Sequence, residues 1–329
     1  MSTPGCSVSV IMPAFNAETY VASAVESVLS QNFEGLELIV VNDGSSDGTG
    51  AVLAGFSNRP GVRILSHPEN ANRGVCASRR LALREAQGEF IAFLDADDRY
   101  LPGKLARHIA LLRADPRVVL VHGPVISESE PAARDPGTKM GFVMGSRSKT
   151  YELASTSGLL ECNRICNSTV VCRHSAVSPE DLPDSMVFQF EDWVLWSQAA
   201  TRGAFRYEPQ PLTVYRQHPD SFSRRQSQHP GAWELAHIEY LATVIGRLPK
   251  SPGRRQASKI LLAEFFRLAR MRNDPGGGEP YSPSYGRVLT ALLQSVAADW
   301  LRQCLRSGFL WKMVRKWKWL KSDDWTNPA

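Results

Sequence analysis

Three aspartates follow directly on a short apolar run at residues 91–98. Residues 91–94 are apolar, and Asp95, Asp97 and Asp98 come immediately after them. Four apolar residues in a row predict a strand buried on both faces, as in the middle of a parallel sheet. Carboxylates this close repel one another, and they favour a site where Mg²⁺ or Mn²⁺ meets a phosphate-containing ligand. A cluster of helix-capping aspartates in a surface turn is the structural alternative.

The elements that must position these acids alternate between strands and helices. Short apolar runs at residues 8–12, 36–41 and 62–65 precede the one at 91–94, and helical spacing follows each of the first three. This alternation predicts parallel strands with right-handed crossovers, whose carboxyl ends share one ligand-binding edge. We expect Asn16 to cap the helix after the first strand. The glycine-rich loop of nicotinamide and flavin enzymes is absent there.

The second half of the chain is less regular and becomes helical toward its end. The predicted elements are a helix at 101–113, a strand at 118–121, a lid or acceptor loop at 127–149, a strand at 168–172, a helix at 194–200, strands at 205–207 and 212–216, and helices at 233–248, 254–271 and 284–305. We therefore predict an α/β catalytic domain over residues 1–228 and a helical region over 229–329.

Composition excludes several classes of protein. The 329 residues are 43% hydrophobic and 22% charged with a net charge of +5, which is ordinary for a globular enzyme and does not demand nucleic acid. Pro13 interrupts the first apolar run, so no signal peptide is predicted, and no run reaches the roughly 18 residues of a membrane span. We expect a cytoplasmic protein whose six cysteines are reduced thiols rather than a zinc site.

Several short motifs stand in a characteristic order. They are Pro13-Ala14-Phe15-Asn16, Asn42-Asp43-Gly44-Ser45-Ser46-Asp47, Asn72-Arg73-Gly74 with Arg79, Asp95-Ala96-Asp97-Asp98, Glu191-Asp192, and Tyr215-Arg216 with His218, Ser221 and Ser223. Together they resemble glycosyltransferase family 2, over roughly residues 7–225. The resemblance implies a GT-A fold, which is α/β with a mixed, mostly parallel sheet flanked by helices. It also implies a nucleotide-diphosphate sugar donor, a divalent metal and inversion at the anomeric carbon.

The resemblance assigns the donor nucleotide to the first strand ends. Residues matching its nucleotide-binding positions are Pro13, Ala14, Phe15, Asn16, Asp43, Arg79, Asp95 and Ser221. Asp43 matches the position that accepts from the base, commonly uracil, and its alternative is a turn-forming aspartate before glycine. Arg79 matches a position near the diphosphate, and its alternative is a solvated helix face.

The resemblance assigns metal binding and sugar binding to the motifs at 95–98 and 215–223. Asp97 matches the direct metal ligand, and Asp95 matches a residue that holds ribose or donor sugar, while Asp98 stays open between metal and structure. His218 matches a position that completes the metal shell or touches the diphosphate, with a structural histidine as its alternative. Ser221 matches a residue that binds phosphate oxygens.

Two adjacent acids match the catalytic position. Asp192 matches the general base that takes the acceptor hydroxyl's proton, and Glu191 is expected to orient the acceptor or support Asp192. The structural alternative for both is a pair of acids in the first turn of a helix, where the helix dipole favours them.

The last segment combines aromatic and basic residues. Residues 299–321 place tryptophans and leucines beside lysines and arginines at helical spacing. This pattern suits a helix lying on an anionic membrane surface, or one packing on the catalytic domain or a second subunit.

We predict an inverting glycosyltransferase that moves a sugar from a UDP-sugar to a glycan or lipid-linked acceptor in cell-envelope polysaccharide assembly, without nucleic acid. The alternatives are a GT-A-like sugar nucleotidyltransferase, whose glycine-rich basic loop is absent here, and a non-catalytic sugar-nucleotide-binding protein.

Overall fold

The computed structural model describes residues 7–129, 143–144, 159–160, 163–184, 190–219, 221, 232–247 and 260. Contacts divide the chain into two compact units, Met1–Ala269 and Arg270–Ala329, and every described residue belongs to the first. The predicted helix at 284–305, all of the predicted helix at 254–271 except residue 260, the basic segment at 299–321 and most of the predicted loop at 127–149 lie outside the described residues. The domain boundary at residues 228–229 stays a prediction.

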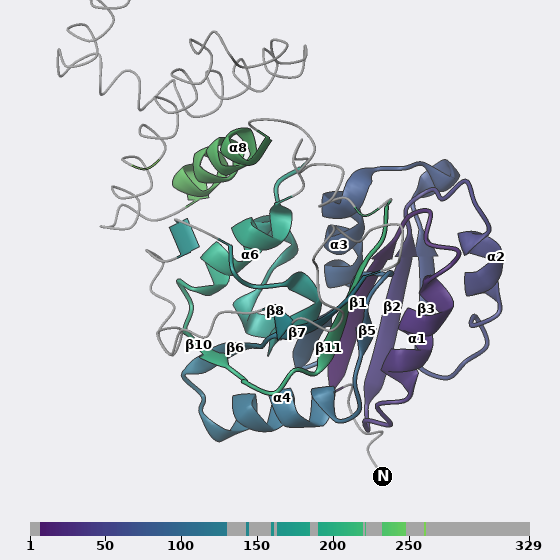
Figure 1. Cartoon of the computed structure of the whole chain (residues 1–329), viewed down its shortest axis with the longest axis horizontal. Helices are drawn as coiled ribbons and strands as arrows, with labels where there is room; N and C mark the ends of the chain where they lie inside the picture. Colours follow the sequence, from purple (N-terminus) through teal and green to yellow (C-terminus); the bar gives the residue numbers. More distant parts are fainter. Residues whose placement is uncertain are drawn as a thin grey trace, which may run out of the picture. The chain divides into compact units, whose positions relative to one another are not determined.

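A seven-stranded sheet forms the centre of the first unit (Figure 1). Its strand order is β10-β6-β9-β4-β1-β2-β3. The strands are β1 (Val8–Ala14), β2 (Leu36–Asn42), β3 (Val62–Ser66), β4 (Phe90–Phe93), β6 (Val118–His122), β9 (Val171–Arg173) and β10 (Ala204–Tyr207). All neighbouring pairs are parallel except those of β9, which runs antiparallel to both β4 and β6. The predicted mixed, mostly parallel sheet is confirmed.

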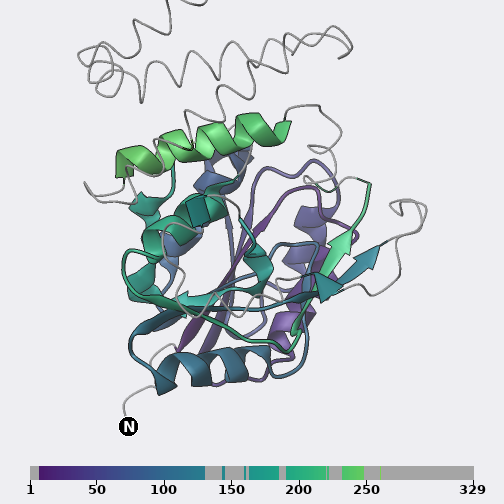
Figure 2. The same ribbon diagram turned by 60° about the vertical axis from the view of Figure 1, so that its left-hand side comes forward.

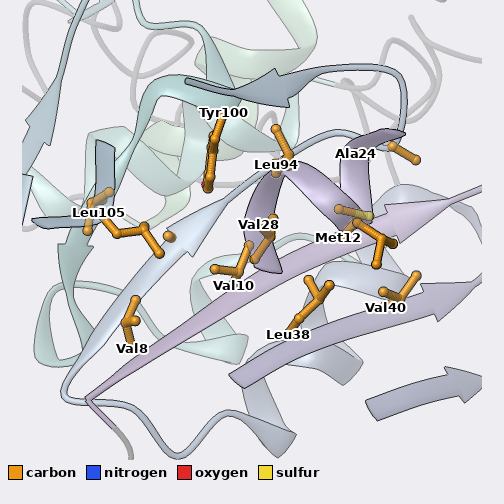
Figure 3. Packing of buried hydrophobic residues seen from close by; sticks show 14 of the residues in the cluster. Val8, Val10, Met12, Ala24, Val28, Leu38, Val40, Leu94, Tyr100 and Leu105 are labelled. Carbon is orange, nitrogen blue, oxygen red and sulfur yellow. The ribbon is translucent and has the colours of Figure 1, made fainter. Parts of the chain in front are cut away.

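Helices cover both faces of this sheet. Apolar side chains of α1 (Val21–Leu29), α2 (Thr49–Ala54) and α4 (Lys104–Ala114) pack on one face, and those of α3 (Gly74–Glu85) and α6 (Glu191–Ala199) pack on the other. Figure 3 shows Val10 and Met12 of β1 within the first of these cores, close to Val28 and Ala24 of α1. Alternate residues of β1 serve opposite cores, since Ile11 packs with α3 and α6. This double burial explains why the strand sequences are almost continuously apolar.

The strand order reverses direction between β1 and β4. The chain leaves β1 outward through β2 and β3, and then returns to place β4 on the other side of β1. The crevice beyond the carboxyl ends of two such strands is the usual ligand site of open α/β sheets. Register places the ends of β1 and β2 together, because Ala14 pairs with Asn42 and the Asp43 N–H donates to the Ala14 carbonyl.

A smaller sheet and one further helix complete the described structure. The order β5-β11-β7-β8 joins β5 (Arg99–Tyr100), β11 (Thr213–Gln217), β7 (Val125–Ser129) and β8 (Val143–Met144). Helix α8 (Ala232–Arg247) packs against α6, as Figure 2 shows from a second direction. Trp193 of α6 stacks on Tyr240 of α8 with ring centroids 3.8 Å apart. No helix in the described part of the chain is long and apolar enough to cross a membrane.

Two local predictions are wrong. Asn16 does not cap α1, which begins after Tyr20 without a side-chain cap. Asn16 instead takes a left-handed backbone with φ of 48° and bonds to the loop after β2. The segment predicted as a strand at 168–172 begins with a 3-10 turn, Asn167–Thr169, and pairs only from Val171. In both cases a polar side chain binds a distant loop rather than its own element.

Three of the six cysteines lie in the described part of the chain. Cys76, Cys166 and Cys172 are free thiols, and burial raises the pKa of each. The other three cysteines lie outside the described residues.

Candidate active site

Asp43 lies at the carboxyl end of β2 in a nearly closed environment. Its Oδ1 accepts from the Arg73 N–H at 2.7 Å, and His67 Nε2 lies 3.5 Å from the same oxygen. Among the described residues, its Oδ2 has no hydrogen-bond partner. The following Gly44 has φ of 68°, and a Cβ there would lie 2.6 Å from the Asn70 carbonyl oxygen. Gly44 therefore lets the loop after β2 pass close to the 70–72 backbone, which leaves one Asp43 oxygen able to accept from a ligand.

The residues after β1 form the neighbouring wall. Asn16 Oδ1 accepts from the Ser46 N–H at 2.8 Å, and the Asn16 N–H donates to Ser45 Oγ at 3.1 Å. These two bonds tie the loop after β1 to the loop after β2. Phe15 is 49% exposed and is the only large hydrophobic side chain that stands exposed in the part of the chain described. An exposed aromatic face beside Asp43 provides a surface on which a planar base can stack.

Both carboxylate oxygens of Asp98 accept hydrogen bonds from other residues of the protein. Its Oδ2 accepts from Ser168 Oγ at 2.5 Å, and its Oδ1 accepts from the Arg216 N–H at 2.9 Å. Burial and the neighbouring Asp97 and Asp95 raise its pKa well above the ordinary value. Of the two interpretations left open for Asp98, this geometry favours the structural one, because both oxygens join β4 to distant segments.

Asp95 is held on one side only. Its Oδ1 accepts from Arg79 at 2.7 Å and from Asn167 Nδ2 at 2.8 Å, while its own N–H donates to Ser168 Oγ. Burial raises its pKa, and the guanidinium opposes that shift. The side chain is 34% exposed, and its Oδ2 has no partner among the described residues. One oxygen of Asp95 is thus anchored and the other is available to a ligand.

Asp97 and His218 come together although 121 positions separate them in the chain. His218 Nε2 lies 3.1 Å from Asp97 Oδ2, and the Asp97 side chain is 30% exposed. Two neighbouring ligands of an octahedral divalent ion stand about 3 Å apart when each bond is about 2.1 Å. The same separation suits a hydrogen bond. Among the described residues, no group of three or more His, Cys, Asp or Glu side chains is arranged to hold a metal ion, and this includes the surroundings of Asp97 and His218.

The surroundings of His218 fix its ring. Tyr20 packs against it with ring centroids 4.6 Å apart, and the Arg216 guanidinium lies over the Tyr20 ring at 4.9 Å from its centroid. Ser221 is buried and donates to the His218 carbonyl at 2.7 Å. The Ser221 hydroxyl therefore stabilises the turn that carries His218. Because its proton is already donated to the His218 carbonyl, the hydroxyl can only accept a hydrogen bond from a ligand.

Asp192 stands in the first turn of α6 on the other side of the site. Its Oδ1 accepts from the Trp193 N–H at 2.6 Å, and its Oδ2 accepts from Asn163 Nδ2 at 3.3 Å. Burial and the adjacent Glu191 charge raise the pKa of Asp192 to about 7, against the opposing effect of Arg79. A carboxylate with a pKa near neutrality is suited to proton transfer at neutral pH.

Glu191 and Arg79 form a buried ion pair behind Asp192. Arg79 donates through one terminal nitrogen to Glu191 Oε1 and through the other to Asp95. Their side chains are only 3% and 5% exposed, and Glu191 Oε2 is buried without a partner in the described chain. The solvated-face alternative for Arg79 is wrong, and Glu191 points into the protein. Of its two expected roles, support of Asp192 fits this burial better than contact with an acceptor.

Sequence reasoning missed the turn Asn167–Thr169. Asn167 binds Asp95, Ser168 binds Asp98 and the Asp95 N–H, and the Thr169 carbonyl accepts from Lys104 Nζ at 2.6 Å. Three small polar residues in succession are a turn signal that should have separated them from the apolar run after them. Nothing in the sequence connects this turn to the aspartates at 95–98.

The site therefore brings the predicted residues onto one sheet edge in two groups. Asp43, Asp95, Asp97 and His218 belong to the strand ends and the turn after β11, while Glu191 and Asp192 belong to α6, and Arg79 links the groups.

Comparison with known proteins agrees with this arrangement. TarS of S. aureus, crystallised with UDP-GlcNAc, superposes with a TM-score of 0.62 at 18% identity, covering 88% of this chain and 81% of that one. A mannosyltransferase of Pyrobaculum calidifontis, in complex with GDP-Man and Mn²⁺, gives a TM-score of 0.55 at 16% identity over 98% and 89% of the two chains. These likenesses establish the GT-A fold.

Sequence relatives narrow the class further. Residues 9–173 match the glycosyl transferase family 2. A β-1,3-glucosyltransferase of Escherichia coli, named as UDP-Glc:α-D-GlcNAc-diphosphoundecaprenol β-1,3-glucosyltransferase WfaP, is 28% identical over 66% of this chain and 79% of its own. An uncharacterized glycosyltransferase of Haemophilus influenzae is 26% identical over 73% and 75%. The chain belongs to glycosyl transferase family 2, and the predicted glycosyltransferase class is confirmed.

Proposed function

We propose that this glycosyltransferase inverts the anomeric carbon of a UDP-sugar while transferring it to a hydroxyl of a lipid-linked glycan. The observation that carries the proposal is the difference between the two acid groups. Asp95 and Asp97 each keep an oxygen open at the strand edge, whereas Asp192 has a pKa raised to about 7. One group suits donor binding and the other suits proton transfer.

The donor nucleotide is proposed to lie between the ends of β1 and β2. The free Asp43 Oδ2 would accept from the imide N–H of uracil, and the exposed Phe15 ring would cover one face of the base. Asp95 Oδ2 would accept from a ribose or sugar hydroxyl. The UDP-glucose in the name of the E. coli relative and the UDP-GlcNAc bound to TarS support a uridine nucleotide.

The proposed cation ligands are Asp97 and His218. Their 3.1 Å separation fits neighbouring positions on one ion, and the remaining positions would belong to diphosphate oxygens and water. When bound, Mg²⁺ or Mn²⁺ supplies positive charge that stabilises the departing nucleoside diphosphate. The Mn²⁺ reported with the P. calidifontis mannosyltransferase supports this assignment.

Asp192 is proposed as the general base. It would take the proton of the acceptor hydroxyl as that oxygen bonds to the anomeric carbon and the bond from this carbon to the diphosphate oxygen breaks. Each Asp192 oxygen already accepts one hydrogen bond, which fixes the carboxylate and leaves lone pairs for the incoming proton. Attack from the face opposite the diphosphate gives inversion. The diphosphoundecaprenol acceptor of the E. coli relative supports a lipid-linked hydroxyl.

A nucleotide panel tests the proposal. UDP, GDP and CDP are added with and without Mn²⁺ while the melting temperature is followed, and UDP-sugars are then assayed for UDP release with a short-chain lipid-diphosphate GlcNAc acceptor. We expect UDP with Mn²⁺ to stabilise the protein and EDTA to reverse that gain. Stabilisation by none of the nucleotides would contradict the proposal.

A further inference from the structure

Arg79 occupies a position between the donor and acceptor sides of the site. It extends from α3 with its side chain 5% exposed, so water contributes little to its solvation. One terminal nitrogen donates to Glu191 of α6 and the other donates to Asp95 after β4 at 2.7 Å. Both terminal nitrogens are therefore used by protein carboxylates.

This arrangement joins the segment after β4 to the first turn of α6 through one side chain. A guanidinium is planar and holds its donors in a rigid fork, so the two carboxylates it binds keep a set spacing and orientation. Asp95 has a second anchor in Asn167, whereas the only side-chain bond to Glu191 among the described residues is that from Arg79. Because Glu191 and Asp192 are adjacent in the first turn of α6, the guanidinium also fixes where Asp192 stands.

We propose that Arg79 is a positioning residue of the transfer reaction: it locks the first turn of α6 against Asp95 and favours the proton-accepting form of Asp192. The inference rests on the proposed role of Asp192 as the base. It differs from the diphosphate contact expected for Arg79, because both terminal nitrogens donate to protein acids. Its Nε is buried without a partner among the described residues.

The charges around Asp192 explain why such a cation matters. Glu191 and Asp95 raise its pKa, and Arg79 is the cation that opposes them. Asn163 donates to Asp192 from the preceding segment, and the nearby Cys166 and Cys76 are neutral because burial raises their pKa values. Helix α8, packed on α6, carries His237 and Glu239. Without Arg79, the charges of Glu191 and Asp95 would raise the pKa of Asp192 further.

The neighbouring arginine offers a matched control. Arg80 also extends from α3, but it donates to the carbonyls of Pro179, Leu182 and Pro183 and pairs with Asp184. It stabilises the segment after η6 (Pro179–Asp181) and does not contact the acids of the site. Arg79 and Arg80 thus lie on the same helix and carry the same charge, and both side chains are largely buried. They differ in the groups that they bind.

The test isolates the Arg79 charge in a Glu191→Gln background, where no unpaired glutamate is left behind. The Asp192 midpoint is followed by carboxyl ¹³C NMR on the full-length, Asp-labelled protein, with Asp192→Asn for assignment. The acid limb of kcat/KM is measured with the donor selected by the nucleotide panel. We expect Glu191→Gln to lower the midpoint from about 7, because one repulsive charge is lost.

Adding Arg79→Met to Glu191→Gln is expected to raise the midpoint again by about one pH unit. Adding Arg79→Lys, which keeps the charge, should restore most of the Glu191→Gln value, and adding Arg80→Met should leave the midpoint unchanged while lowering the melting temperature. Equal midpoints for the Arg79→Met and Arg80→Met combinations would overturn the proposal. The NMR midpoint decides this even if the wild type turns over no donor, an outcome that would count against the proposed function instead.

Discussion

Two groups of ionisable side chains flank the turn Asn167–Thr169, and they differ in the partners that their charges have. The acid group, Asp95, Asp97 and Asp98, has a partner for each carboxylate: Arg79 and Asn167, His218, and Ser168 with the Arg216 N–H. The basic cluster, formed by Lys104 and His108 of α4 and His122 of β6, is almost fully buried. Within the described chain, Lys104 takes part in no ion pair.

The basic cluster responds to burial through its protons. Burial lowers the pKa of Lys104 to about 7 and that of His122 to about 4, and His108 Nδ1 lies 3.4 Å from the Lys104 ammonium. A buried charge without a counterion loses its proton easily, whereas a buried charge with a partner is retained. The contrast lies in the partners. Every carboxylate of the acid group has a hydrogen-bond or ion-pair partner, although burial still raises the pKa values of Asp95 and Asp98, whereas Lys104 has no counterion in the described chain and burial lowers its pKa.

The largest expected effect is on the rate of transfer, and it separates the role of Asp192 in the reaction from the binding of the donor. Asp192→Asn removes the proposed proton acceptor while keeping the shape of the side chain. We expect transfer to fall by about 10²–10⁴-fold, with the affinity for UDP in the presence of Mn²⁺ unchanged. Steady-state rates and calorimetric titration with UDP measure the two quantities. Undiminished turnover would remove Asp192 from the mechanism.

The next prediction divides the acid group itself. Asp97→Asn should weaken the Mn²⁺-dependent affinity for UDP by about 10²-fold or more, because a direct ligand is lost, while the melting temperature without metal changes little. Asp98→Asn should instead lower the unfolding free energy by about 1–3 kcal/mol, since its amide would face the Arg216 N–H or Ser168 Oγ. Isothermal titration and thermal melts of both variants make the comparison. The opposite pattern would identify Asp98 as the ligand.

The last prediction concerns the stability contribution of the basic cluster and leaves transfer activity unchanged. The folded pKa of Lys104 is about 7 and the unfolded one is about 10.4, so between these values the unfolded chain binds one more proton. The unfolding free energy then rises with pH in this window, by up to about 1.4 kcal/mol per pH unit from this group.

Lys104→Met removes that contribution. The unfolding free energy of the wild type should therefore rise relative to that of the variant as the pH rises from 7 to 9. Urea unfolding of both proteins measures this difference. Transfer activity per folded molecule should stay close to wild type. A difference independent of pH would mean that Lys104 remains charged in the folded protein.

The amino-acid sequence by itself determined the order of strands and helices and the edge on which the acids collect. Largely apolar runs at 8–12, 36–41 and 91–94 correspond to β1, β2 and β4, because strands buried on both faces carry few polar residues. The polar residues in the first two runs, Ser9 and Glu37, are buried and bonded to each other. Since parallel strands end at one edge, the polar residues that follow them necessarily meet there. These are local properties of composition and spacing, and the family motifs add the order in which they occur.

Only the tertiary structure decided what each acid is free to do. The partners of Asp98 lie 70 and 118 positions away in the chain, and the partner of Asp97 lies 121 positions away. Likewise, Arg79 is recognisable as an arginine on a helix, but its burial between Asp95 and Glu191 depends on how α3 packs on β1 and β2 and on where folding places the two acids. The availability of a carboxylate and its pKa depend on the neighbours that folding brings within hydrogen-bond distance, and sequence spacing does not encode those distances.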